Sequence, residues 1–193
     1  MKKVILVLLA SCLSGGIFAQ KESKADVLKK NENPVPQKKY SCDSINVNFE
    51  TGLLNGKIGP SSPPDSIKKF LPCVSAEYPM GDDQQVCGGG LSLDKQGIYF
   101  NLEHGLIEFS SNTTAFLPAK ILGAAEDDLA GLMQMEPTQI TDIQPVGDRP
   151  IISVYLFPKN YGCVAIWVDQ KDKKAFKIQV HNVDASKVYL CIY

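Results

Sequence analysis

Cysteine and histidine are the residue types in this chain that best suit nucleophilic catalysis. Cys87 precedes Gly88-Gly89-Gly90, which would set a thiol beside backbone N–H donors, and the two histidines are His104 and His181. A nucleophilic thiol needs a base within hydrogen-bond reach. His104 stands at a turn before Gly105, and His181 falls on the polar side of an expected strand. We therefore expect both histidines at the surface and predict no catalytic residue and no enzymatic activity.

Residue spacing and charge also bear on metal, cofactor and nucleic-acid sites. No C-x-x-C occurs, the histidines are not spaced as zinc ligands, and the three acids at 126–128 do not match a calcium loop. The glycines at 88–90 continue into a strand, so we expect a bulge or a close strand approach rather than a phosphate loop. The formal net charge is −1, and residues 1–40 carry eight lysines against three acids, which leaves −6 for residues 41–193. We predict no metal, no cofactor and no nucleic-acid partner.

The N-terminal region has the features of an export signal. Residues 1–19 begin with two lysines, continue with a short apolar run and end in Ile-Phe-Ala before Gln20, which predicts a secretory signal cleaved after Ala19. The alternative is that Leu-Ala-Ser-Cys at 9–12 is a lipobox and that Cys12 is acylated. Residues 20–40 are lysine-rich and contain two prolines, as is typical of a flexible tether. The expected location is periplasmic or secreted, with an outer-membrane lipoprotein as the alternative, and membrane contact is expected only if Cys12 is lipidated.

Five cysteines follow the signal, and most should pair in an oxidising compartment. Fifteen arrangements of two bridges remain open from the sequence alone. The spacing favours a Cys73–Cys87 bridge, because Cys73 ends an expected helix and Cys87 opens the next strand. Cys163 and Cys191 lie on late strands that we expect to be neighbours. We predict these two bridges and an unpaired Cys42.

Hydrophobic periodicity predicts helices and strands in the same order in two halves of the chain. Alternation at 45–49 indicates a half-buried strand, and Pro64 and Asp65 begin a helix that Pro72 ends. A second helix begins with the acids at 126–128 and ends by Pro137. The expected strands are 86–93, 98–102 and 106–109 in the first half and 151–157, 163–168, 176–180 and 188–192 in the second. This order predicts an α+β fold of two repeated units, 41–114 and 115–193, each a short helix followed by an antiparallel meander, with the helices on one face of the sheet.

This order of elements resembles the tandem repeat of the β-lactamase inhibitory protein family and the single repeat of the SmpA/OmlA class of outer-membrane lipoproteins. The resemblance covers roughly residues 45–182. It rests on the element order, on the segment Asp-Ser-Ile-Lys-Lys-Phe-Leu-Pro at 65–72, and on Cys73 and Cys87, since the inhibitor family also closes a helix-to-strand loop at this place. It departs from the family pattern where Leu71-Pro72 stands for a glycine near the helix end.

The placement of aromatic residues leads to a hypothesis about function. If the late strands align, Tyr155, Trp167 and Tyr189 crowd one sheet face, opposite an aliphatic face that includes Ile166, and His181 lies on the polar side of its strand. An open face with tyrosine and tryptophan is typical of protein-binding surfaces, although such residues also cover the edges of cores. We predict a non-enzymatic exported protein that binds another exported or envelope protein, as an inhibitor, an immunity-type neutraliser or an envelope accessory.

The alternative is a small-ligand-binding protein or a hydrolase with a pocket between the two halves. In that case His181, Cys163 or Tyr161 is expected at the edge of the pocket.

Overall fold

The computed structural model describes residues 41–81, 87–145, 147 and 149–190. The predicted signal (1–19), the tether (20–40), Cys12 and Cys191 lie outside these residues. No helix in the described part of the chain is long and apolar enough to cross a membrane.

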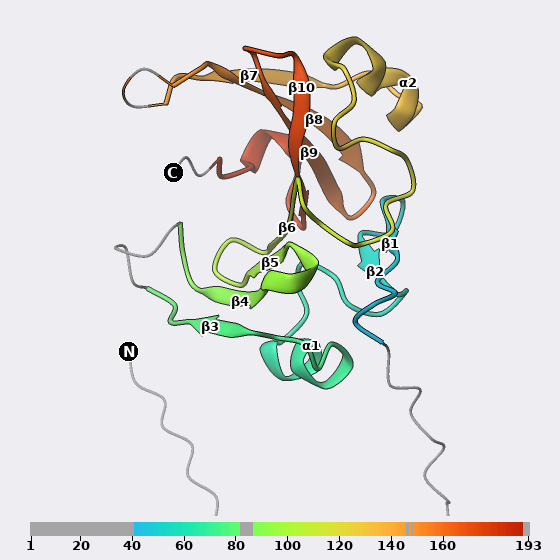
Figure 1. Cartoon of the computed structure of the whole chain (residues 1–193), viewed down its shortest axis with the longest axis vertical. Helices are drawn as coiled ribbons and strands as arrows, with labels where there is room; N and C mark the ends of the chain where they lie inside the picture. Colours follow the sequence, from blue (N-terminus) through green and yellow to red (C-terminus); the bar gives the residue numbers. More distant parts are fainter. Residues whose placement is uncertain (1–40, 82–86, 146, 148, 191–193) are drawn as a thin grey trace, which may run out of the picture. The chain divides into compact units, whose positions relative to one another are not determined.

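The described residues form mostly antiparallel sheet with two short helices, so the coarse α+β prediction is confirmed. Eight strands make one sheet in the order β3-β4-β5-β6-β10-β9-β8-β7, while β1 and β2 form a separate two-stranded sheet (Figure 1). The strands are β1 (Val47–Asn48), β2 (Leu53–Leu54), β3 (Ala76–Tyr78), β4 (Gly90–Leu93), β5 (Ile98–Asn101), β6 (Leu106–Ser110), β7 (Gln139–Ile143), β8 (Ile152–Lys159), β9 (Gly162–Asp169) and β10 (Lys174–His181). The helices are α1 (Pro64–Phe70) and α2 (Leu129–Met133), with short 3-10 turns η1 (Asp94–Gln96), η2 (Glu126–Asp128) and η3 (Ala185–Lys187).

The large sheet is built from two groups of four consecutive strands. Within β3–β6 and within β7–β10 each strand pairs with its neighbour in the sequence. The two groups meet where β6 pairs antiparallel with β10, so that Glu108 lies opposite Gln179 and Ser110 opposite Lys177. In Figure 1 the green first group lies below the orange second group, with β6 and β10 at the junction.

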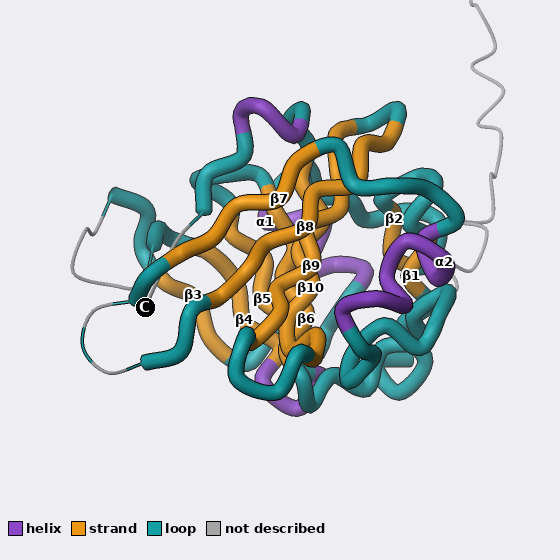
Figure 2. Tube along the Cα trace, turned by 90° about the horizontal axis from the view of Figure 1, so that it is seen from above, coloured by secondary structure: helices purple, strands orange, loops and turns teal. Residues whose placement is uncertain are grey.

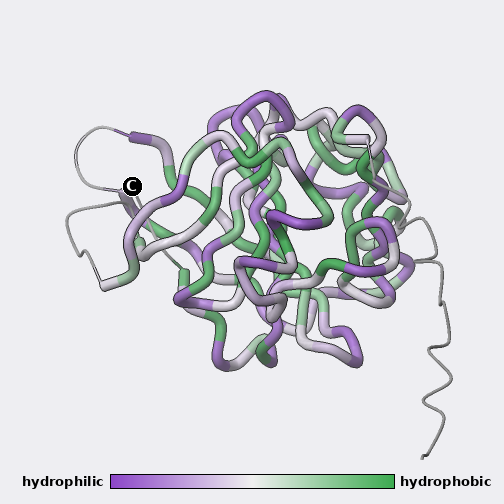
Figure 3. The backbone as a smooth tube through the Cα atoms, turned by 90° about the horizontal axis from the view of Figure 1, so that it is seen from below, coloured by the Kyte–Doolittle hydropathy of each residue, from purple (hydrophilic) through white to green (hydrophobic). Residues whose placement is uncertain are grey.

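One face of the sheet, which we call the inner face, carries the main hydrophobic core. Its buried side chains alternate along the central strands, as the period of two in the sequence predicts. They are Leu91, Leu93, Ile98, Phe100, Ile107, Phe109, Tyr155, Phe157, Val164, Ile166, Val168, Ile178 and Val180. Ile67 of α1 and Leu129 and Met133 of α2 belong to the same cluster, so both helices pack against this face. Figure 2 shows both helices beside the strands, and Figure 3 shows hydrophobic and hydrophilic residues alternating along them.

Helix α1 begins and ends where the sequence predicts. Pro64 takes the first helical position, where a missing N–H costs no hydrogen bond, and Asp65 places a carboxylate in the first turn near the positive end of the helix dipole. Leu71 follows the helix, because the residue before Pro72 disfavours helical backbone. The predicted strand at 45–49 is also supported, since Ile45, Val47 and Phe49 are buried while the residues between them are exposed.

Three elements differ from the sequence-based expectation. The strands β3 and β7 were not among the expected strands, because the edge strands of a sheet are short and carry polar residues. The predicted last strand, 188–192, is wrong for its described part: residues 188–190 are irregular and follow the turn η3. A strand there would need an open sheet edge, but β10 already lies between β6 and β9.

The glycines at 88–90 allow strands to approach closely, as expected. A Cβ atom on Gly89 would lie 2.4 Å from the carbonyl oxygen of Pro79, and one on Gly90 would lie 2.0 Å from that of Phe100. Any larger residue would clash with backbone at both positions. The run is therefore a packing requirement of β4 between its neighbours.

The disulfide arrangement differs from the predicted one. Cys73 is bonded to Cys42, with 6.1 Å between their Cα atoms, so the predicted Cys73–Cys87 bridge and the unpaired Cys42 are both wrong. Cys163 is a free, buried cysteine, which also contradicts the predicted Cys163–Cys191 bridge. Cys87 is disulfide-bonded. The bridge that is described ties the beginning of the folded region to the end of α1.

Candidate functional site

Trp167 lies on the face of the sheet opposite the main core, as predicted, but that face is not open at this position. Its side chain is 1% exposed and packs in a second apolar cluster with Val154, Leu156 and Ala165. Ala185, Val188 and Leu190 from the C-terminal segment pack against the same cluster. We call this side of the sheet the outer face. The segment 185–190 covers its β7–β9 half, so the prediction of an exposed Trp167 is wrong.

Tyr155 does not share a face with Trp167. In the register between β8 and β9, Tyr155 lies opposite Ile166 and Val154 lies opposite Trp167. Tyr155 therefore points to the inner face and belongs to the main core. A shift of one residue in register exchanges the two faces of a strand, which is why the sequence alone misplaced it.

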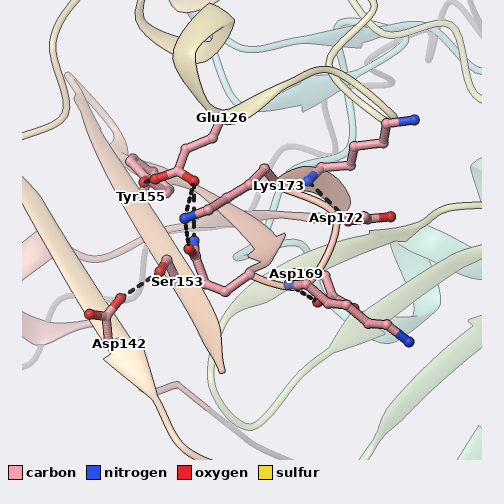
Figure 4. A network of polar contacts seen from close by, with 10 residues as sticks. Glu126, Asp142, Ser153, Tyr155, Asp169, Asp172 and Lys173 are labelled. Carbon is pink, nitrogen blue, oxygen red and sulfur yellow. Dashed lines mark hydrogen bonds and ion pairs between the residues drawn. The ribbon is translucent and has the colours of Figure 1, made fainter. Parts of the chain in front are cut away.

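The hydroxyl of Tyr155 holds the turn before α2 in place. It donates a hydrogen bond to Glu126, and Lys173 forms an ion pair with the same carboxylate at 3.1 Å (Figure 4). Gln170 donates to it as well, at 3.3 Å. The hydrogen bond from Tyr155 is the main reason that the pKa of Glu126 is lowered, and burial raises the pKa of Tyr155. This network is an internal support between the β9–β10 turn and the segment that leads into α2.

The other two predicted partner-binding residues are also placed apart. Tyr189 is 53% exposed and lies outside the sheet, with its ring stacked on His104 at 4.2 Å between centroids. His181 is 1% exposed, in contrast to the expected surface position. Tyr155, Trp167, Tyr189 and His181 therefore do not form one open aromatic face.

Cys163 and His181 are directly opposite each other on β9 and β10 and are both buried. Burial raises the pKa of Cys163 to about 12 and lowers the pKa of His181 to about 4, with His104 adding to the second shift. At neutral pH the pair is a thiol and an uncharged imidazole. A thiol in this state is a poor nucleophile.

Tyr161 was the third residue expected at a pocket edge. Its hydroxyl is buried without a hydrogen-bond partner among the described residues.

The buried state of His181 predicts a loss of stability in mild acid. Its folded-state pKa lies below its ordinary value near 6.5, so the unfolded chain binds the proton more readily. The contribution of uncharged His181 to the free energy of unfolding is complete above pH 6.5 and is lost as the pH falls toward 4. Between pH 7 and pH 5 we expect the free energy of unfolding of the natural protein to fall by about 2 kcal/mol more than that of His181→Gln. Urea unfolding at the two pH values measures this, and equal falls in both proteins would contradict it.

A buried polar cluster marks the junction of the two strand groups on the outer face. Trp167 Nε1 donates to Gln179 Oε1 at 2.9 Å, and Gln179 Nε2 donates to Glu108 Oε2 at 2.8 Å. Lys177 lies 3.4 Å from the same Glu108 oxygen and 4.2 Å from the centre of the Trp167 ring. His181 Nε2 lies 3.2 Å from Gln179 Oε1, which can only accept, so His181 carries its proton on Nε2. These contacts give the buried polar groups of the junction hydrogen-bond or ion-pair partners.

Beside this cluster, the β4–β6 half of the outer face contains a recess of about 190 Å³. Its lining comes from β4, η1, β5, β6 and the turn after β6: Ser92, Asp94, Gly97, Ile98, Tyr99, Glu108, Ser110 and Asn112. We call it the β5–β6 recess. Tyr99 lies opposite both Ser92 and Glu108 in the sheet, so the three side chains share the outer face. This is the candidate functional site.

The polar groups of the β5–β6 recess are held by the strands around them. Ser92 donates to the carboxylate of Asp94, and this hydrogen bond is the main reason that the pKa of Asp94 is lowered. The Tyr99 hydroxyl donates to the carbonyl oxygen of Gly88 at 2.8 Å, and its burial raises the pKa of Tyr99 to about 12. Ser110 donates to the side chain of Asn112. At neutral pH the recess therefore contains the ionised carboxylate of Asp94 beside the uncharged phenol of Tyr99.

A second pocket, of about 610 Å³, lies around η2 and α2. Six of its eight lining residues are exposed: Lys120, Gly123, Ala125, Asp127, Asp128 and Gly131. Binding sites usually combine enclosure with a few convergent polar groups, so this surface is the weaker candidate.

The backbone N–H group of Gly89, within the glycine run, already has an acceptor. Glu103 accepts hydrogen bonds from the N–H groups of Gly81 at 3.3 Å and Gly89 at 3.2 Å, and these lower its pKa. The chain thus supplies its own anion to these donors. No group of three or more residues suited to a metal ion is found in the described part of the chain.

Sequence reasoning did not find the β5–β6 recess. Its signal was present in the alternation of β5 and β6, where Tyr99 and Glu108 lie between buried apolar residues and Ser110 follows buried Phe109. The sequence does not show the strand pairing that brings these positions together.

No family model matches the chain, and no match was found among curated proteins or solved structures.

Proposed function

We propose that this protein is an exported, non-enzymatic module that binds another exported or envelope protein through the β4–β6 half of its outer face. The observation that carries the proposal is the β5–β6 recess. It combines two carboxyl side chains, an aromatic ring and small hydroxyl groups on strands that the buried junction keeps in place. Tyrosine-bearing, preorganised surfaces of this kind favour protein partners, because little side-chain freedom is lost on binding.

The size of the β5–β6 recess supports a protein partner over a small-molecule substrate. Sites for small molecules and cofactors usually measure about 300–1,000 Å³. A recess of about 190 Å³ suits one side chain projecting from a larger surface. The aromatic pair of Tyr78 and Tyr99, whose rings lie 6.0 Å apart edge to face, adds contact area beside it.

The order of elements supports the tandem repeat predicted from the sequence. Helix α1 precedes β3–β6, and η2 with α2 precedes β7–β10. In this proposal the two units resemble those of the β-lactamase inhibitory protein family, and the chain acts as an inhibitor, an immunity-type neutraliser or an envelope accessory protein. Periplasmic or secreted location, or anchoring through a lipidated Cys12, follows from the predicted signal and remains part of the proposal.

Blocking the β5–β6 recess should abolish partner capture. Asn112 is exposed at its rim, so Asn112→Trp fills the entrance without disturbing the core. We expect immobilised natural protein to retain one specific protein from an envelope extract, and Asn112→Trp to retain at least about tenfold less, because hot-spot losses reach 2 kcal/mol or more. Affinity capture followed by mass spectrometry measures the retained amount.

The matched control is Lys171→Trp, which places the same side chain on an exposed turn between β9 and β10. It should retain the partner as the natural protein does. Equal retention by all three proteins, or no specific protein retained by the natural one, would contradict the proposed function.

A further inference from the structure

The charge balance of the β5–β6 recess differs between its two carboxylates. Glu108 is compensated by Lys177 at 3.4 Å and receives the hydrogen bond from Gln179. Asp94 takes part in none of the ion pairs of the described residues. Its side-chain hydrogen-bond partners are Ser92 and Ser75, whereas a carboxylate accepts about four hydrogen bonds. Asp94 therefore presents an uncompensated negative charge with free acceptor positions.

The remaining lining complements a planar cation. Tyr99 stays uncharged at neutral pH, so its ring offers a negative π face without a competing charge. Ser92, Ser110 and Asn112 add hydroxyl and amide oxygens beside the two carboxylates. Oxygen acceptors around an aromatic wall match the five N–H donors and the flat shape of a guanidinium group better than they match an anion or an apolar side chain.

Resting on the proposed function, we propose that the β5–β6 recess receives an arginine side chain from the partner protein, with Asp94 as the residue that pairs with the guanidinium. Two further facts favour this occupant. The region 41–193 carries a net charge of −6, so a partner with a basic surface is attracted to it. The recess holds a side chain rather than a whole ligand, and arginine is enriched among the residues that dominate interface energies.

An NMR titration of the purified protein with N-acetylarginine amide tests this inference without the partner. We expect the backbone amide signals of Asp94, Tyr99, Ser110 and Asn112 to shift, with a dissociation constant in the millimolar range. The neutral analogue N-acetylcitrulline amide has nearly the same shape and should bind at least about tenfold more weakly, since only the arginine probe gains the charge-assisted hydrogen bonds. Binding of the arginine probe should also weaken as salt is added.

Two variants locate the interaction. Asp94→Asn keeps the shape of the side chain and should weaken binding of the arginine probe at least tenfold. Asp127→Asn removes an exposed acid from the second pocket and should leave binding of the arginine probe unchanged. Equal binding of the two probes, equal binding by natural protein and Asp94→Asn, or shifts spread over other acidic residues would overturn the inference. If partner capture depends on the rim residue Asn112 but the probe does not bind, the proposed function survives and the arginine assignment fails.

Discussion

Replacing Trp167 by alanine is expected to lower the free energy of unfolding by about 4 kcal/mol, within the range of about 3–5 kcal/mol typical of buried aromatic residues. The side chain is 1% exposed, and its removal leaves a cavity between the sheet and the C-terminal segment. It also removes the hydrogen-bond donor to Gln179 and the ring beneath Lys177. Urea unfolding followed by circular dichroism measures the change.

Trp167→Phe serves as the matched variant, because it keeps an aromatic ring and loses the indole N–H. We expect a smaller cost of about 1–2 kcal/mol, since a buried acceptor loses one partner. In the natural protein, iodide should quench the fluorescence of Trp167 poorly until the chain unfolds. Ready quenching of the folded protein, or a cost for alanine below 1 kcal/mol, would mean that the segment 185–190 does not cover this face.

Removing the disulfide bond between Cys42 and Cys73 should lower the free energy of unfolding nearly as much as Trp167→Ala does. The bridge closes a loop with a sequence separation of 31 residues. In the chain-entropy account such a loop stabilises the fold by about 3.5 kcal/mol, because the cross-link restricts the unfolded chain. The Cys42→Ser, Cys73→Ser double variant should lose about this amount in urea unfolding without added reductant.

Peptide mapping under non-reducing conditions provides the direct check on this pairing. The peptide that contains Cys42 should be recovered linked to the one that contains Cys73, and the Cys163 peptide should be recovered with a free thiol. Alkylation of Cys163 should require unfolding, because the thiol is buried. Recovery of Cys73 linked to Cys87 would restore the arrangement expected from spacing and would contradict the structure.

The candidate site shows why residue types alone were insufficient. Aromatic residues of the second half were expected on an open face, but the open polar surface is in the first half, around Tyr99 and Asp94. The sequence contains the alternation that puts Tyr99 opposite the core. It does not contain the information that residues 185–190 cover one half of the outer face, because that cover depends on contacts between segments distant along the chain.

Local patterns by themselves determined the elements with strong periodicity and clear boundaries. The buried alternation at 45–49, the limits of α1 between its prolines and the strands β5, β6 and β8–β10 follow from backbone preference and hydrophobic spacing, which act over a few residues. The side of β9 that carries Ile166 was also correctly identified as core, because its aliphatic neighbours are dense.

Only the tertiary structure decided the register of the strands, the pairing of the cysteines and which polar positions of the sheet are buried. Tyr155 faces the core because β8 pairs with β9 so that it lies opposite Ile166, and a register one residue different would have sent it outward. Cys42 reaches Cys73 because the chain folds back past α1, and a cysteine pairs with the thiol nearest in space rather than in sequence. His181, polar by its place in an alternating strand, is buried on β10 between β6 and β9, and a strand's own residues do not specify which strands will flank it.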